Sequence, residues 1–497
     1  MKKRILLLAF IPFLFSCERD PQVNPSPETQ FTEISRLQIG GEAAAEITAY
    51  DPVTSQLFVV NNSNGSTVDV INFSNPSQPY KVSSIQIASF GGGVNSVAVK
   101  NGLLAIAVEA SVKTDNGSIV IFRTDNLTNP VANVAVGALP DMVTFSPNGR
   151  FIISANEGEP SPDYAIDPPG TVSIIDEFSN FQVTTLGFAA FEGQLNALKS
   201  QGYRVFGPNA SLSTDTEPEY VAIDQNSEVA WITLQENNGI ARINLINQTV
   251  EGIFPLGLKD ISLVGNEMDA SDRDNSINLK NWPVYSYYLP DAIAYFHSGN
   301  TNYLITANEG DTRDYPGFAE EARVKDLQLN PANFPNWQDL RKDQNLGRYT
   351  VTTSAGDDNG DGIYEALYGI GGRSFTVWNG DNGQKVLDYN RLEKDFLEYA
   401  SSKYDDGRSD NKGVEPEAVT IGQSADKTLV FIGLERSDAV MVYELNNVAG
   451  FSLLQVLETG DAPEGVLFIS AAESPTRKDL LVVSSEGDGF LRVYQNR

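Results

Sequence analysis

Apolar and polar residues alternate along most of the chain, in short segments rich in β-branched and aromatic residues that are separated by Gly, Asn and Asp. Alternation with a period of two residues predicts β-strands joined by turns. Helical spacing is found in RLEKDFLEYASSKY (391–404), where Leu392, Phe396 and Tyr399 share one face. A short amphipathic helix is expected there.

Three kinds of strand segment recur in the same order along the chain and form one repeat. Each unit opens with an acidic or amide residue, often after Pro, and the seven openings are AAEITAY, VNSVAVK, LPDMVTF, EPEYVAI, LPDAIAY, EPEAVTI and APEGVLF. A second apolar strand follows and ends in Glu or Asn, and a third has a V-x-V/I-Y-like pattern. Openings lie 46 to 49 residues apart where nothing intervenes, which is close to the length of one four-stranded propeller blade.

The repeat predicts an all-β fold, a single seven-bladed β-propeller of four-stranded blades with WD40/YVTN-like repeats, spanning 31–497. Longer intervals predict insertions, with loops and short helices, near 187–215, 256–288, 310–372 and 391–412. The chain ends on a third strand, GFLRVYQNR, while FTEISRLQIGG at 31–41 resembles the fourth strands. The N-terminal strand is therefore expected to complete the last blade and hide its edge.

The first residues predict a lipoprotein. Three basic residues precede an apolar run of 11 residues, Ile5 to Phe15, which is too short to span a bilayer and is typical of a signal peptide over 1–16. Leu14-Phe15-Ser16-Cys17 resembles a lipobox, so Cys17 is the expected lipidation site. Residues 17–30 are polar and Pro-rich and are expected to form a flexible tether. The acidic residues after Cys17 are typical of Bacteroidota-type surface lipoproteins, which predicts an outer-membrane location exposed at the cell surface.

Charge limits the function classes. The formal net charge is −30, from 65 Asp and Glu against 35 Lys and Arg. Such a surface repels phosphate backbones and excludes nucleic-acid binding, while it attracts cations. With one Cys and one His, no internal disulfide and no multi-His metal site can form. We expect a monomer whose partners are the membrane, through the lipid, and an unknown extracellular protein, glycan, mineral or phosphate ligand.

The acidic positions of the repeat predict a candidate site. The start of a blade's first strand and the end of its antiparallel second strand lie at the same face, so both positions should gather at one channel mouth. The predicted metal ligands are Glu157, Glu219, Glu309, Glu417, Glu435, Glu464, Asp141, Asp291, Glu236 and Glu486. Oxygen ligands suit Ca²⁺, with Mg²⁺ as an alternative. A purely structural role stays equally open, because Arg313, Arg323, Arg373, Arg408 and Arg436 are close enough in sequence to pair with these carboxylates.

Two further acidic segments stand out. In DDNGDGIYE, Asp357, Asn359, Asp361 and Glu365 match positions of an EF-hand-like loop. The twelfth position is Tyr368 rather than Glu, so a local calcium-binding turn is expected, with a solvated turn as the alternative. The segment from Asp405 to Gly413 carries mixed charges and is expected to be a salt-bridged loop over the mouth.

Several segments resemble a known family. They are ANEGEPSPDYAIDPPGTVSIID, DTEPEYVAID, WITLQENNGIARINL, LPDAIAYF, YLITANEGDTRDY, GGRSFTVWNG, DGRSDNKGVEPEAVTIG, FIGLERSDAVMVYEL and GDAPEGVLFI. Together, over about residues 40 to 495, they resemble the mesenchyme-specific cell-surface glycoproteins of echinoderm skeleton-forming cells and their bacterial choice-of-anchor I relatives. The resemblance implies an extracellular propeller held at the cell surface. Animal members are associated with biomineralisation, and some bacterial members carry an alkaline-phosphatase label; the resemblance assigns no catalytic residue.

Two functions follow from these observations. The first is a non-catalytic, calcium-binding surface propeller that acts as a binding or scaffold module through its acidic mouth. The alternative is a calcium-dependent phosphoesterase, like phytase or alkaline-phosphatase propellers, with Arg373 or Arg436 as an anion clamp. Whether the chain is an enzyme stays open at this point.

Overall fold

The structure is a computed structural model, and it describes residues 29–497. Cys17 and most of the predicted tether lie outside the described residues, so the lipidation site stays a prediction. None of the helices from residue 29 onward is both long and apolar enough to cross a lipid bilayer.

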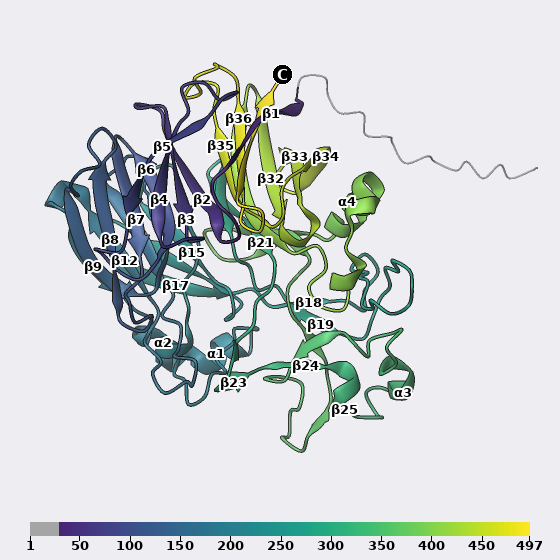
Figure 1. Cartoon of the computed structure of the whole chain (residues 1–497). Helices are drawn as coiled ribbons and strands as arrows, with labels where there is room; N and C mark the ends of the chain where they lie inside the picture. Colours follow the sequence, from purple (N-terminus) through teal and green to yellow (C-terminus); the bar gives the residue numbers. More distant parts are fainter. Residues whose placement is uncertain (1–28) are drawn as a thin grey trace, which may run out of the picture.

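Seven four-stranded antiparallel sheets make up most of the described chain (Figure 1). From first to fourth strand, the sheets are β2 (Ala44–Asp51), β3 (Gln56–Asn61), β4 (Thr67–Asn72) and β5 (Tyr80–Gln86); β6 (Val94–Lys100), β7 (Leu103–Val108), β8 (Asn116–Arg123) and β9 (Ala132–Ala138); β10 (Pro140–Phe145), β11 (Phe151–Asn156), β12 (Thr171–Asp176) and β13 (Gln182–Leu186); β14 (Val221–Ile223), β15 (Val229–Leu234), β16 (Gly239–Asn244) and β17 (Thr249–Pro255); β20 (Ile293–Ser298), β21 (Thr301–Asn308), β29 (Ser374–Asn379) and β30 (Lys385–Tyr389); β31 (Pro416–Ser424), β32 (Lys427–Leu434), β33 (Ala439–Asn447) and β34 (Gly450–Glu458); and β35 (Pro463–Ile469), β36 (Leu480–Ser485), β37 (Phe490–Asn496) and β1 (Phe31–Gln38). The predicted all-β class is confirmed.

The last sheet combines the two ends of the described chain. Strand β1 pairs antiparallel with β37, with Phe31 opposite Asn496 and Gln38 opposite Phe490. Phe31 is 2% exposed and its ring packs edge-on against Phe431 of the preceding sheet, at a centroid separation of 5.4 Å. The N-terminal strand is therefore a packed part of the last sheet.

Neighbouring sheets pack face to face through apolar side chains. The first strand of each sheet contacts the first strand of the next, and β35 contacts β2. Each neighbouring pair shares a hydrophobic cluster. The last sheet shares one with the first, in which Leu57 and Phe73 lie with Leu480 and Val493. Successive side chains of a strand point to opposite faces of its sheet. The apolar side chains on each face therefore pack against the neighbouring sheet on that side, as sheet-on-sheet packing requires.

The first strands begin with an irregular backbone. The residue before Pro has a positive φ at Leu139, Leu289, Glu415 and Ala462, between 46° and 52°. In five of the sheets the pairing with the second strand then shifts register around the residue that opens the repeat. Such bulges leave the extra residue out of the ladder and change the direction of its side chain. The extra residue is Asp141 in the third sheet, Glu464 in the last and Asn95 in the second. Glu46 and Glu417 lie within wider shifts that include their neighbours.

The segments expected as insertions carry the remaining strands and helices, apart from two 3₁₀ turns that join strands of the four-stranded sheets, η1 (Glu177–Ser179) and η6 (Glu435–Ser437). A five-stranded sheet combines β18 (Leu258–Asp260), β19 (Tyr285–Tyr287), β28 (Tyr368–Gly369), β26 (Thr350–Thr352) and β24 (Glu321–Arg323). Two-stranded pairs are β22 (Asp314–Tyr315) with β23 (Phe318–Ala319), and β25 (Gln328–Leu329) with β27 (Ile363–Tyr364). The α-helices are α1 (Leu195–Lys199), α2 (Leu212–Asp215), α3 (Trp337–Leu340) and α4 (Leu392–Ala400), and the 3₁₀ turns are η1 (Glu177–Ser179), η2 (Ala189–Gln194), η3 (Val324–Asp326), η4 (Ser401–Lys403), η5 (Asp406–Arg408) and η6 (Glu435–Ser437).

Helix α4 confirms the helix expected in 391–404, but its buried face differs. Leu392 and Phe396 are fully buried, whereas Tyr399 is 49% exposed.

All four inserted segments follow a second or a fourth strand, so strand direction places them at the end of the sheets where the first strands begin. Figure 1 shows β18, β24, β25 and α3 together on that side, away from the start of β1.

Candidate functional site

The acidic positions of the repeat meet at the end of the sheets that carries the inserted segments, here called the mouth. Pro140 pairs with Asn156 and Pro416 with Leu434. The carboxylates that follow Pro140 and Asn156 in the chain, Asp141 and Glu157, therefore lie at the same end of one sheet. The structure brings three groups of three carboxylates close enough that one oxygen from each lies within 4.8 Å of the others.

The first group, called the Glu157 cluster, contains Glu157, Glu219 and Glu236. Glu219 and Glu236 are only 7% and 5% exposed. One carboxylate oxygen of each, Oε2, has no hydrogen-bond partner within the described residues. Burial and the neighbouring carboxylates raise the pKa of Glu157 and Glu219 well above the ordinary range. Among the described residues, none of the three carboxylates forms an ion pair with a basic side chain, and burial disfavours their charged form.

Arg313 is a buried basic side chain that acts on Glu236 of the Glu157 cluster. Its guanidinium is 2% exposed and pairs with Asp215 and, at 2.9 Å, with Glu217. The attraction of Arg313 lowers the pKa of Glu236, although burial outweighs it and the net shift is upward. Because Arg313 is already bound by two carboxylates, it does not neutralise the Glu157 cluster.

The second group, called the Asp291 cluster, contains Asp291, Glu309 and Glu417. The Lys412 Nζ lies 2.6 Å from the Glu309 Oε1. Burial and nearby carboxylates raise the pKa of Asp291 and Glu417 well above the ordinary range. The Glu417 Oε2 is buried with no hydrogen-bond partner among residues 29–497. Within residues 29–497, Lys412 pairs with Glu309 alone of the three carboxylates, and its other acidic contacts, Glu415 and Asp311, lie outside this cluster.

The third group, called the Glu415 cluster, contains Glu309, Glu415 and Glu435. Glu415 accepts a 2.6 Å hydrogen bond from the Arg408 Nε and lies 3.5 Å from the Lys412 Nζ. Arg436 pairs with Glu435 at 2.9 Å and approaches Glu415 to 3.7 Å. The predicted salt-bridged loop from Asp405 to Gly413 is confirmed by these ion pairs. This cluster is compensated by basic side chains, as the structural alternative required.

The remaining predicted ligands lie around the mouth outside the three groups. Burial raises the pKa of Glu46 to about 7, with Glu486 and Asp141 adding to the shift and a hydrogen bond from Asn62 opposing it. Burial also raises the pKa of Asp141 to about 6. Burial, followed by the charges of Glu46 and Glu486, raises the pKa of Glu464 well above the ordinary range. These carboxylates therefore lie close enough to influence one another.

The two predicted anion-clamp residues lie in different surroundings. Arg373 is 6% exposed and donates to the backbone carbonyls of Asp269, Ser409 and Asn411, so its guanidinium holds inserted segments together. The Arg436 side chain is 46% exposed beside Glu435. Of the two, Arg436 is the one that lies at the mouth with a solvent-exposed group.

The EF-hand-like segment forms a compact exposed turn. Asp357 accepts hydrogen bonds from the backbone N–H groups of Gly360, Asp361 and Gly362. Glu365 accepts from Asn330 and from the backbone of Asp358. The three carboxylate groups found in the described part of the chain do not include this turn, and calcium binding there stays a prediction.

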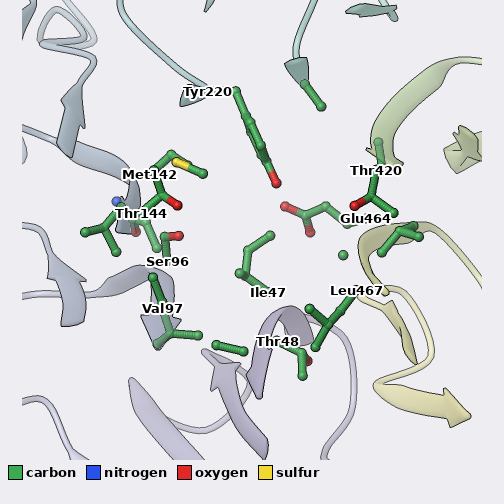
Figure 2. A pocket seen from close by; sticks show the side chains of 18 of the residues that line it. Ile47, Thr48, Ser96, Val97, Met142, Thr144, Tyr220, Thr420, Glu464 and Leu467 are labelled. Carbon is green, nitrogen blue, oxygen red and sulfur yellow. The ribbon is translucent and has the colours of Figure 1, made fainter. Parts of the chain in front are cut away.

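Sequence reasoning missed two features of the mouth. Lys113 forms an ion pair with Glu159, and neither residue belongs to the repeated positions. A cavity of about 340 Å³ runs between the first strands and is lined by Asp141, Asp291, Glu464 and Tyr220 together with apolar side chains. Figure 2 shows the Tyr220 hydroxyl pointing toward Glu464 across this cavity. Tyr220 directly follows an opening Glu, which is the sequence signal that could have identified it.

Comparison with known proteins assigns the family. Residues 46–448 match the choice-of-anchor I domain. The chain belongs to the choice-of-anchor I family. The resemblance seen in the sequence is thereby confirmed.

Two curated relatives and one solved structure extend this result. Gigasin-3a of Magallana gigas is 28% identical over 191 residues, covering 32% of this chain and 67% of the relative. The mesenchyme-specific cell surface glycoprotein of Strongylocentrotus purpuratus is 24% identical over 329 residues, covering 56% of this chain and 42% of the relative. A chain of Kuenenia stuttgartiensis hydrazine synthase superposes with a TM-score of 0.50 at 11% identity, over 92% of this chain and 97% of that chain. At this identity the likeness concerns the β-propeller-like fold alone.

Proposed function

We propose that this choice-of-anchor I protein is a cell-surface β-propeller that binds Ca²⁺ at the Glu157 cluster and acts as a non-catalytic binding or scaffold module. The observation that carries the proposal is the pair of buried Oε2 atoms of Glu219 and Glu236, which have no partner within residues 29–497. Unpaired buried carboxylates are costly, and a cation is one of the few remedies.

The proposed architecture is a closed ring of seven blades. Its support is the set of hydrophobic clusters between successive sheets, together with the cluster shared by the last and the first sheet. The pairing of β1 with β37 supports closure as well. In a closed ring the first strands surround the central cavity, and every acidic opening faces the same mouth.

The donor set favours a hard cation. The Glu157 cluster offers carboxylate oxygens, and Ca²⁺ takes six to eight oxygen ligands in a flexible geometry, whereas Mg²⁺ demands a stricter octahedron. Three carboxylates leave coordination positions for water or for an oxygen of a partner. We propose that an anionic partner, such as a phosphate, a mineral surface or an acidic glycan, binds the chain through this metal.

The family and the relatives support the proposed surface location. A family of anchored domains and a relative named as a cell surface glycoprotein support attachment outside the cell. The predicted lipid on Cys17 would supply the anchor to the outer membrane. We infer a scaffold role from these likenesses rather than from any residue.

Calorimetric melting of the purified full chain tests the metal. Because a ligand that binds only the folded state stabilises it, Ca²⁺ at 100 times its Kd should add about 2.7 kcal/mol. A chain of this size has an unfolding entropy of roughly 1 kcal/mol per K, so the melting temperature should rise by about 3 °C over its value in EDTA. An unchanged melting temperature would contradict the proposal.

A substitution locates the effect. The double variant Glu219→Gln with Glu236→Gln should lose the calcium-dependent rise. Glu228→Gln is the matched control, because Glu228 is exposed in the turn between β14 and β15, at the opposite end of the same sheet. If the double variant keeps the rise, the ion binds elsewhere, and if the control loses it too, the loss reflects the removed charge and not the site.

The phosphoesterase alternative depends on one observation, the exposed Arg436 beside the Glu415 cluster. Hydrolysis of an aryl phosphate by wild-type chain with Ca²⁺, abolished by chelation and reduced by Arg436→Met, would establish it. Absence of turnover with any divalent metal removes this alternative.

A further inference from the structure

The cavity of about 340 Å³ between the first strands is a place in the molecule that the proposed calcium binding does not use (Figure 2). It follows β10 from Asp141 to Thr144 and β6 from Asn95 to Val99. Since a strand rises about 3.3 Å per residue, the cavity is roughly 10–13 Å deep. None of the three carboxylates of the Glu157 cluster lines it.

The charged types of side chain in the cavity lining are all acidic. They are Asp141, Asp291 and Glu464, and within the described chain no lysine or arginine lines the cavity. Burial raises the pKa of all three, and nearby carboxylates add to the shift, while the attraction of Lys113 opposes it at Asp141. The Glu464 Oε2 is buried and has no hydrogen-bond partner among residues 29–497. The lining therefore favours an occupant with a positive charge, which would restore the charged form of a carboxylate.

The walls beside the carboxylates are largely apolar. Ile47, Val97 and Leu467 lie around the cavity, and Tyr220 presents its hydroxyl to Glu464 (Figure 2). Burial raises the pKa of Tyr220, so this hydroxyl stays protonated and neutral. A carboxylate and a hydroxyl beside aliphatic walls match a small ligand with a cationic head and an apolar body.

The spacing of the carboxylates favours an ammonium over a metal ion. Within the described residues, Asp141, Asp291 and Glu464 are not one of the groups of three that bring an oxygen of each within 4.8 Å of the others. A calcium ion needs several oxygens around it at about 2.3–2.6 Å. An ammonium has three N–H donors and can be held by one carboxylate and neutral acceptors. Glu464 and the Tyr220 hydroxyl offer such a pair.

We propose that this cavity is a binding site for a small primary alkylammonium ion. The ammonium donates to the Glu464 carboxylate and to the Tyr220 hydroxyl oxygen, and the alkyl chain packs against Ile47, Val97 and Leu467. Since an extended chain advances about 1.2 Å per bond, six carbons and the nitrogen span about 7–8 Å and fit within the depth of the cavity. The site is separate from the proposed calcium site and does not depend on it.

Isothermal titration of the full chain with n-hexylammonium tests the site. EDTA removes divalent metal, and about 0.15 M KCl limits loose binding to the acidic surface. Wild-type chain should bind one ion, with an affinity at least about tenfold higher than for 1-hexanol, which has the same apolar chain without the charge. From propylammonium to hexylammonium, each added methylene should tighten binding about fourfold, because each buries more apolar surface.

Two variants and one control locate the ion. Glu464→Gln should weaken hexylammonium binding at least about tenfold and leave 1-hexanol binding unchanged. Tyr220→Phe keeps the ring and should weaken hexylammonium binding roughly two- to tenfold. Asp488→Asn is the matched control and should bind like the wild type, because Asp488 follows β36 at the mouth end of the sheet that carries Glu464 but does not line the cavity. A melting transition like that of wild type shows that each variant is folded.

Four results would overturn the proposal. They are no saturable binding at millimolar hexylammonium, an affinity that does not change with chain length, equal affinities for hexylammonium and 1-hexanol, and an equal loss of binding in Asp488→Asn and Glu464→Gln. The second and the fourth would show that the acidic surface holds the ion rather than the cavity. None of these results concerns the Glu157 cluster, whose calcium response the melting experiment decides on its own.

Discussion

Glu46 offers a test of the electrostatics of the mouth that is separate from metal binding, because it belongs to none of the three clusters. Burial, with help from Glu486 and Asp141, raises its pKa from 4.5 to about 7. The folded state therefore favours the protonated form. The stabilisation is fully present below the unfolded pKa, at about pH 4.5, and is lost as the pH rises through about 7.

The magnitude follows from the shift. One pKa unit corresponds to about 1.4 kcal/mol, so the shift of Glu46 gives an upper limit of roughly 3 kcal/mol. Partial exposure of the side chain reduces this to about 1–3 kcal/mol. Glu46→Gln keeps the shape and can still accept the hydrogen bond from the Asn62 Nδ2, at 3.0 Å in the wild type. At pH 8 the variant should be more stable by that amount, and at pH 4, below the unfolded pKa, its stability should approach that of the wild type.

Differential scanning calorimetry from pH 4 to pH 8 in EDTA measures the effect. With an unfolding entropy of roughly 1 kcal/mol per K, the variant should melt about 1–3 °C above wild type at pH 8. Glu228→Gln removes an exposed charge at the other end of a sheet and should melt like the wild type at every pH. If the melting temperatures of Glu46→Gln and wild type changed in parallel with pH, the assigned pKa and the crowding of carboxylates that causes it would be refuted.

Two predictions concern stability alone. Arg313→Met leaves buried Asp215 and Glu217 without their counterion and should lower the free energy of unfolding by about 3–5 kcal/mol in urea titrations; a loss under 1 kcal/mol would mean that these carboxylates are protonated in the folded chain. Phe31→Ala removes a buried ring that joins the last two sheets and should cost about 3–5 kcal/mol, whereas a neutral effect would show that β1 is dispensable for the last sheet.

The strands and the acidic positions could be predicted because they repeat. Seven openings of one sequence pattern identify the first strands, and antiparallel pairing then places the acidic or amide residues of both positions at one end of each sheet. The bulge and the positive φ at Leu139 or Ala462 were not predictable, because a residue before Pro is expected to be extended. These irregularities decide how each carboxylate points.

The pairing of the carboxylates could not be predicted, because it depends on inserted segments. Lys412 and Arg408 reach Glu309 and Glu415 only after the loop folds back over the mouth. Arg373 was expected near a ligand, yet it holds backbone carbonyls instead, since its side chain turns into the inserted segments. Tyr399 was placed on the buried face by helical spacing alone, and the neighbours of α4 leave it exposed.

The pairing of β1 with β37 has a consequence for orientation. Phe31 lies opposite Asn496, at the end of the sheet farthest from the carboxylates, and β1 runs from there toward the mouth (Figure 1). A chain tethered to a bilayer on the N-terminal side of Phe31 would stand with its acidic end facing outward. A fully extended chain with the 13 residues that separate Cys17 from Phe31 would span at most about 45–50 Å. Soluble ligands would then meet the carboxylates before they meet the lipid headgroups.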